Sequence, residues 1–69
     1  MLRLRAERLR RGWSQTHVTI LTGIASPDVS AIERGVRYAP PGWRRRLAVA
    51  FKVPEAELFA EVPDEVASA

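Results

Sequence analysis

Hydrophobic residues in the first part of the chain recur at steps of three and four positions, which is the spacing of one face of an α-helix. The residues that share this face are Leu2, Ala6, Leu9 and Trp13. We predict a helix over residues 2–11 that buries this face. Gly12 follows a run of arginines, which is typical of a helix end because cations suit its negative pole and glycine tolerates a positive φ.

A second helix is predicted over residues 14–22. Ser14 can cap its start, and Val18 and Leu21 are expected to form its buried face. Gly23 then breaks the helical pattern.

A third helix is predicted over residues 26–34. Ser26 offers a capping hydroxyl, Pro27 suits the first turn because it needs no donor there, and Asp28 places an acid at the positive pole. Residues 35–41 contain two prolines and are expected to form a loop.

A fourth helix is predicted over residues 42–51, and a short fifth helix opens at Pro54 and directs Leu58 and Phe59 to the core. The apolar positions of the fourth helix are Trp43, Leu47, Ala50 and Phe51. No segment alternates apolar and polar residues as a strand does. The sequence therefore predicts an all-α fold, a compact bundle of five short helices.

The composition fits one small globular domain, with 46% hydrophobic and 28% charged residues. We place this domain over residues 1–61 and a short acidic, frayed tail over residues 62–69. The chain has no cysteine, and His17 is its one histidine, so we expect no disulfide, no metal site and no cofactor. No apolar run is long enough for a membrane span or a signal peptide, and we expect a cytoplasmic protein.

The charges are distributed unevenly along the chain. Residues 1–52 carry all 11 basic residues and three acidic ones, a net charge of +8, whereas residues 53–69 carry five acids and no base. A basic body with an acidic end suggests a polyanionic partner that approaches from one side.

Residues 14–35 combine a capped helix, a short turn with glycine and a second helix, which is typical of a helix-turn-helix. The chain resembles the Cro and phage-repressor family of DNA-binding domains over residues 2–59. The resemblance is carried by Ser14-Gln15, Gly23-Ile24, Ser30-Ala31-Ile32-Glu33-Arg34-Gly35 and Val53-Pro54-Glu55-Ala56-Glu57-Leu58-Phe59. It implies that the second and third helices form the helix-turn-helix, and that the third enters the major groove of DNA.

Several residues are predicted to bind DNA phosphates. Gln15 lies at a helix start, where backbone donors attract a phosphate, and the resemblance implies that its amide adds a contact; otherwise it is only a solvated residue. The arginines that open the fourth helix oppose its dipole, which phosphate oxygens would offset, although solubility also explains them. The predicted phosphate-binding set is Arg8, Ser14, Gln15, Arg37, Arg44 and Arg45.

The resemblance also implies an ion pair between Arg8 and Glu33, which would join the first helix to the end of the third. We favour a structural role for Glu33, while the same resemblance places Arg8 close to a phosphate as well. Thr19 departs from the family, which favours alanine where the second and third helices cross.

The outward side chains of the third helix are expected to contact bases. They are Ser26, Pro27, Ser30 and Ala31, with Arg34 further along. Serine hydroxyls can approach any base, whereas proline and alanine can touch only a thymine methyl, so DNA shape is expected to contribute to specificity. Asp28 either accepts from a cytosine amino group or, as we prefer, serves the helix N-terminus.

Four other residues stand out. We expect Trp13 and Trp43 in the core, with a Trp43 indole donor facing DNA as the alternative. We expect His17 to be an exposed first-turn residue. Ile20 stands where relatives usually carry a polar group, and we expect it to be exposed and available for a protein contact.

We interpret the chain as a sequence-preferring, repressor-like transcriptional regulator that binds double-stranded DNA as a homodimer. The candidates for the dimer surface are Leu58, Phe59 and Val62. The sequence contains no catalytic nucleophile paired with a general base, no set of metal ligands and no phosphate-binding loop, so we do not expect an enzyme. No small-molecule effector site is evident. The alternative is a protein-interaction module of the same fold, such as an antitoxin or a co-regulator.

Overall fold

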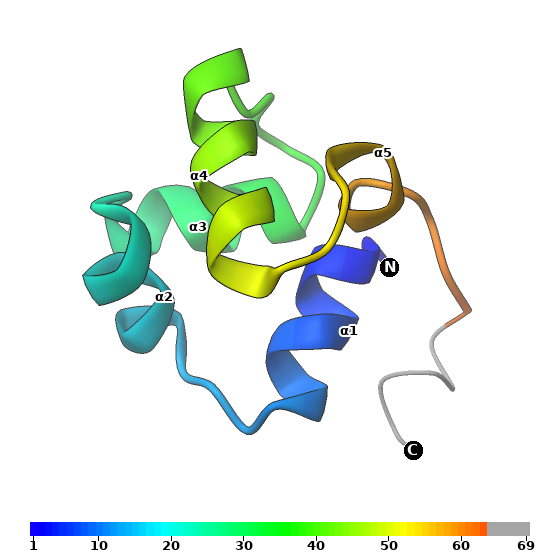
Figure 1. Cartoon of the computed structure of the whole chain (residues 1–69), viewed down its shortest axis with the longest axis horizontal. Coiled ribbons are helices and arrows are strands. Elements are labelled where there is room, and N and C mark those ends of the chain that lie inside the picture. Colours follow the sequence, from blue (N-terminus) through cyan, green and yellow to red (C-terminus); the bar gives the residue numbers. More distant parts are fainter. Residues whose placement is uncertain (64–69) are drawn as a thin grey trace.

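Five helices make up the computed structural model, which describes residues 1–63 (Figure 1). They are α1 (Arg3–Arg10), α2 (Gln15–Thr22), α3 (Ser26–Glu33), α4 (Pro41–Phe51) and α5 (Glu55–Leu58). The described residues contain no strand beyond one isolated bridge between Leu2 and Glu61. The predicted all-helical bundle of five short helices is confirmed.

The starts of α2 and α3 are capped differently. The Ser14 Oγ accepts a hydrogen bond from the His17 backbone N–H at 3.0 Å, and so caps α2 as predicted. At α3 the N-cap position belongs to Ala25, and Ser26 is already helical. The prediction that Ser26 caps this helix was therefore wrong, because its hydroxyl lies 2.9 Å from the Thr19 hydroxyl instead.

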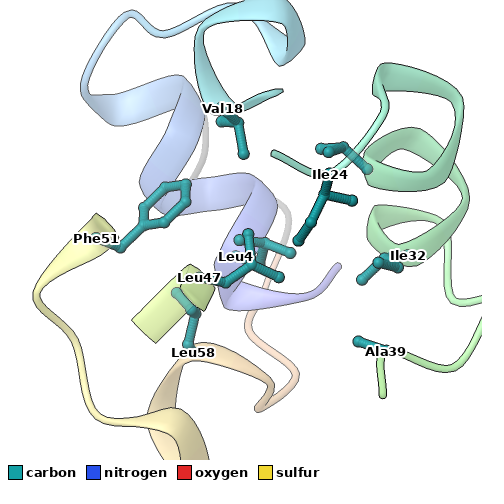
Figure 2. Packing of buried hydrophobic residues seen from close by; sticks show 9 residues of the cluster. Leu4, Val18, Ile24, Ile32, Ala39, Leu47, Phe51 and Leu58 are labelled. Carbon is teal, nitrogen blue, oxygen red and sulfur yellow. The ribbon is translucent and has the colours of Figure 1, made fainter. Parts of the chain in front are cut away.

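The core consists of nine buried apolar residues that come from all five helices and from two of the connecting segments (Figure 2). They are Leu4, Val18, Ile24, Val29, Ile32, Ala39, Leu47, Phe51 and Leu58. Trp13 and Trp43, predicted as core residues, are partly buried and pack against this cluster. Each large apolar side chain buried in this way contributes about 1.5–3 kcal/mol to folding.

The buried faces of α1 and α2 differ from the predicted ones. Leu9 and Leu21 are 39% and 45% exposed, whereas Leu4 is fully buried. Thr22 is also buried, and its hydroxyl is satisfied by donating to the Val18 carbonyl at 2.7 Å. A polar side chain that bonds within its own helix can be buried at little cost, and a search for apolar spacing does not find it.

The two ends of the described chain are joined by backbone hydrogen bonds. The Met1 ammonium donates to the Val62 carbonyl at 3.0 Å, and the Val62 N–H donates to the Met1 carbonyl at 2.8 Å. The Arg3 N–H donates to the Ala60 carbonyl at 2.8 Å. Val62, predicted to begin the frayed tail, is thus bonded to the domain, while residues 64–69 of that tail lie outside the described residues.

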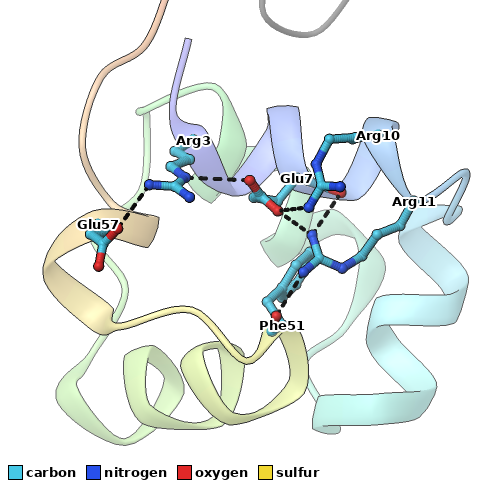
Figure 3. Close-up of polar contacts among 6 residues, drawn as sticks. All are labelled: Arg3, Glu7, Arg10, Arg11, Phe51 and Glu57. Atoms are coloured by element: carbon cyan, nitrogen blue, oxygen red, sulfur yellow. Dashed lines mark hydrogen bonds and ion pairs between the residues drawn. The ribbon is translucent and has the colours of Figure 1, made fainter. Parts of the chain in front are cut away.

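Three arginines surround the Glu7 carboxylate on α1 (Figure 3). Arg10 donates to it at 2.6 Å and Arg3 at 3.3 Å. Arg11 donates to it too, and also to the Phe51 carbonyl at 2.8 Å, which connects α1 to the end of α4. Burial alone would raise the pKa of Glu7, but the hydrogen bonds from the arginines outweigh it and lower the pKa from 4.5 to about 2.

A buried ion pair joins α1 to the end of α3. Arg8 Nε donates to Glu33 Oε2 at 2.7 Å, and Arg8 Nη2 donates to Glu33 Oε1 at 3.0 Å. The two side chains are only 10% and 2% exposed. Arg8 Nη1 also donates to the Trp13 carbonyl at 2.9 Å, so the charge is both paired and hydrogen-bonded.

Replacing Glu33 tests how much this pair stabilises the fold. Glu33→Ala leaves the Arg8 charge buried without its carboxylate and should lower the free energy of unfolding by about 3–5 kcal/mol. Glu57→Ala, which removes the exposed partner of Arg3, is the control and should cost much less. Urea unfolding followed by circular dichroism measures both variants, and equal losses would contradict a special role for the buried pair.

The lowered pKa of Glu7 predicts a dependence of stability on acid pH. Because the folded-state pKa of about 2 lies below the ordinary value of 4.5, the carboxylate stabilises the fold above pH 4.5, and this contribution is lost as the pH falls through 2. Glu7→Gln should remove that part of the pH dependence. Urea unfolding of both proteins across this interval measures it, and identical pH profiles would count against the prediction.

Candidate nucleic-acid interface

The turn between α2 and α3 determines how the two helices cross. Gly23 has a φ of 76°, in the left-handed region that glycine adopts readily, and the next residue, Ile24, is buried in the core. The Thr19 hydroxyl donates to the Gln15 carbonyl at 3.2 Å, so Ser26 must donate in the bond between the two hydroxyls, since each carries one proton. Thr19 therefore connects the two helices at the place where the family favours alanine.

The side of α3 that faces away from the core carries the predicted base-contacting positions. Val29 and Ile32 are buried on the inner side. The exposed or half-buried positions are Ser26, Pro27, Ser30, Ala31 and Arg34. The Ser26 proton is already used toward α2, which leaves that hydroxyl as an acceptor, and Arg34 is the longest side chain of the set.

Asp28 on α3 has an arginine beside it. Its Oδ1 lies 3.5 Å from Arg37 Nε, and the Arg37 guanidinium lies 5.0 Å from the centroid of the Trp43 ring. Both partners of the ion pair are more than one-third exposed, so the pair contributes little to stability. It does reduce the repulsion that the Asp28 carboxylate would exert on a nearby phosphate.

Gln15, the first residue of α2, is bonded to the buried ion pair. Its Nε2 donates to Glu33 Oε1 at 3.3 Å, and an amide nitrogen carries a second proton that can serve another acceptor. Arg8 uses three of its donor atoms inside the chain and is 10% exposed, a geometry that favours its structural role. The exposed Ser14 hydroxyl accepts a hydrogen bond from the His17 N–H. This bond caps α2 directly before its first residue, Gln15.

The three arginines at the start of α4 have different surroundings. Arg44 Nε lies 3.1 Å from Glu55 Oε1, and the guanidinium stands 4.1 Å from the centroid of the Phe59 ring. Arg45 and Arg46 are exposed and form no ion pair within residues 1–63. Arg44 is thus held in place by the fold, while its two neighbours are available to a partner.

The loop between α3 and α4 exposes two large residues that the sequence pattern did not single out. Val36 is 69% and Tyr38 is 72% exposed, and the Arg44 guanidinium lies 5.8 Å from the centroid of the Tyr38 ring. The signal was a tyrosine directly after Arg37 in a loop, because tyrosine is common at binding surfaces.

Three further expectations are settled by burial. His17 was predicted to be exposed but is half-buried, because its ring packs 4.9 Å from the ring of Trp13. Ile20 is 75% exposed, as predicted. Leu58 was predicted as part of the dimer surface. That prediction was wrong, because Leu58 is fully buried in the core of its own chain.

Two kinds of feature are absent from residues 1–63. No helix there is long and apolar enough to cross a membrane. The same residues contain no group of three or more histidine, cysteine, aspartate or glutamate side chains that could hold a metal ion.

Comparison with known families identifies the domain. The profile of the helix-turn-helix domain family matches residues 2–60, a range that contains all five helices. No curated protein and no solved structure matches the chain. The matched range and the packing of α2 on α3 agree with the family that the sequence resembles. The chain therefore belongs to the helix-turn-helix domain family, and this membership indicates a DNA-binding regulator.

Proposed function

We propose that the chain is a sequence-preferring transcriptional regulator that inserts α3 into the major groove of double-stranded DNA. The observation that carries this proposal is the outer side of α3, which is free of large apolar residues and is followed directly by basic residues on the next loop and on α4. Small side chains allow the helix to approach base edges closely, and cations beside it attract the phosphates.

Phosphate contacts are proposed on α2, on the loop after α3 and on α4. Gln15 offers an amide proton at the α2 start, where the backbone N–H groups and the helix dipole also favour an anion. The other proposed contacts are Arg37 on the loop after α3 and Arg44 and Arg45 near the start of α4. Arg37 and Arg44 are supported by the rings of Trp43 and Phe59, and this support limits the side-chain entropy lost on binding.

The base-contacting set is proposed to give moderate direct discrimination. Ser30 and Ala31 are short, and Pro27 has no donor, so Arg34 is the one member able to make a bidentate contact with guanine. Sequence-dependent DNA shape would then supply much of the preference, because the phosphate contacts fix the duplex against the protein.

Homodimerisation is part of the proposal because one small domain contacts a short half-site, and two copies can bind half-sites about 10 base pairs apart. With Leu58 buried, Phe59 and Val62 are what remains of the predicted dimer surface. Both are half-buried, and Phe59 is covered by Arg44.

The phosphate contacts predict a salt dependence. Arg45→Ala should weaken binding to all duplexes by a similar factor. It should also make the negative slope of log K against log salt less steep by about 1, because one phosphate contact is lost. Arg5→Ala is the matched control, since Arg5 is an exposed arginine on α1, away from the proposed interface. Fluorescence anisotropy at several salt concentrations measures the slope, and equal changes in the two variants would refute the Arg45 contact.

The placement of α3 predicts a change in base preference. Ala31→Arg introduces a bidentate donor on the outer side of the helix, and the preferred sequence should gain a guanine at one position per half-site. Ala56→Arg on α5 adds the same charge at an exposed alanine and should leave the preference unchanged. Selection from random duplexes compares both with the wild type.

The same selection separates this proposal from a protein-interaction module. Such a module would gain only non-specific affinity from the added arginine, to the same extent in both variants. Identical base preferences in the wild type and the Ala31 variant would therefore rule out contact between this side of α3 and the bases.

A further inference from the structure

An apolar groove lies between α2 and α4, on residues that the proposed DNA contacts leave almost untouched. It is lined by Leu21, Arg45, Arg46, Val49 and Ala50, and we name it the α2–α4 groove. Leu21 is 45% and Val49 is 70% exposed, large values for apolar side chains on adjacent helices. Apolar surface concentrated in a groove is typical of a place where another molecule binds.

A second hollow adjoins the groove near the end of α4. This hollow shares Leu21 and Ala50 with the first, and its other lining residues are Arg11, Trp13, His17, Phe51 and Lys52. We refer to the two adjoining hollows together as the channel, and its lining includes leucine, valine, alanine and aromatic side chains.

The charged residues along this channel are all basic. Arg11 is paired with Glu7, a carboxylate that it shares with two other arginines, but Arg45, Arg46 and Lys52 are exposed and form no ion pair within residues 1–63. No acidic residue of that range lines either hollow. The channel therefore combines an apolar floor with an uncompensated positive rim.

We propose that the α2–α4 groove binds an acidic amphipathic helix of a partner protein. An apolar stripe on such a helix would cover Leu21, Val49 and Ala50, and its flanking carboxylates would meet the cations of the rim. DNA suits the groove less well, because phosphates gain nothing from an apolar floor. A second copy bound face to face suits it less well too, because the same cations would oppose one another.

This inference does not depend on the proposed DNA-binding function. Arg45 is the one residue shared by the groove and the proposed phosphate contacts, and the test therefore uses Val49 and Arg46. A failure to bind the acidic helix and a failure to bind DNA are then separate results.

The test uses a synthetic helical peptide with leucines at positions i, i+3, i+4 and i+7, glutamates at the positions that flank this stripe and alanines elsewhere, so that repulsion between glutamates does not unfold it. Its control is a peptide of the same composition with the leucines scattered around the helix. We expect the first peptide to bind and to shift the NMR amide signals of Leu21, Val49 and Ala50, and the scattered peptide to bind at least about tenfold more weakly.

Two pairs of matched variants locate the site. Val49→Glu places a carboxylate on the groove floor and should weaken binding about tenfold, whereas Val36→Glu changes a valine of equal exposure elsewhere and should have no effect. Arg46→Glu should likewise weaken binding more than Arg5→Glu, which changes the net charge by the same amount on α1.

Four results with the peptide would overturn the proposal, and a fifth concerns the chain alone. The four are the absence of peptide binding at about 1 mM, equal affinity for the two peptides, equal effects within either variant pair, and signal shifts confined to α3 and the following loop. The last result would mean that the peptide only imitates DNA. Self-association that Val49→Glu abolishes would assign the groove to a second copy of the chain, and would also overturn it.

Discussion

The relative placement of the first three helices depends on the buried ion pair between Arg8 and Glu33. A buried charge costs several kcal/mol unless it is paired and its remaining donors are bonded, so the pair tolerates little displacement of α1 against α3. Arg8 also holds the Trp13 carbonyl, and Glu33 accepts from Gln15 at the start of α2. One interior contact thus positions both the helix proposed for the DNA groove and the amide proposed for a phosphate.

Polar contacts between helices contribute a large share of the stability of this fold because the apolar core is small. A domain of 69 residues buries only about 60% of the surface of its unfolded chain, and the cluster of nine apolar residues must be supplemented. Arg11 connects Glu7 on α1 to the Phe51 carbonyl at the end of α4, and Met1 pairs with Val62 across the ends of the described chain. These contacts link segments that are far apart in sequence. Joining such segments lowers the conformational entropy of the chain more than joining neighbours does, so the contacts must offset a larger entropic cost.

Apolar spacing and the glycines and prolines between the helices were sufficient to predict the five helices, although the capping hydroxyl was assigned correctly only at α2. They were insufficient to predict the inner face of α1, where charged residues that have partners are buried beside Leu4 while Leu9 remains exposed. The resemblance to a known family supplied the pairing of Arg8 with Glu33, which composition and spacing do not contain. The support of Arg44 by Phe59 depends on how α5 packs, and no local pattern encodes that packing.

Arg45 gives the two proposed surfaces a physical connection. At the α4 start it is proposed to bind a phosphate, and it also lines the groove proposed for an acidic helix. An acidic partner in the groove would neutralise Arg45 and so lower the affinity for DNA. By thermodynamic reciprocity, bound DNA would lower the affinity for the partner by the same factor. Because α3 is proposed to make few direct base contacts, the phosphate contacts would carry much of the affinity, and the loss of one of them would weaken DNA binding noticeably. A small domain could in this way respond to the concentration of a partner protein.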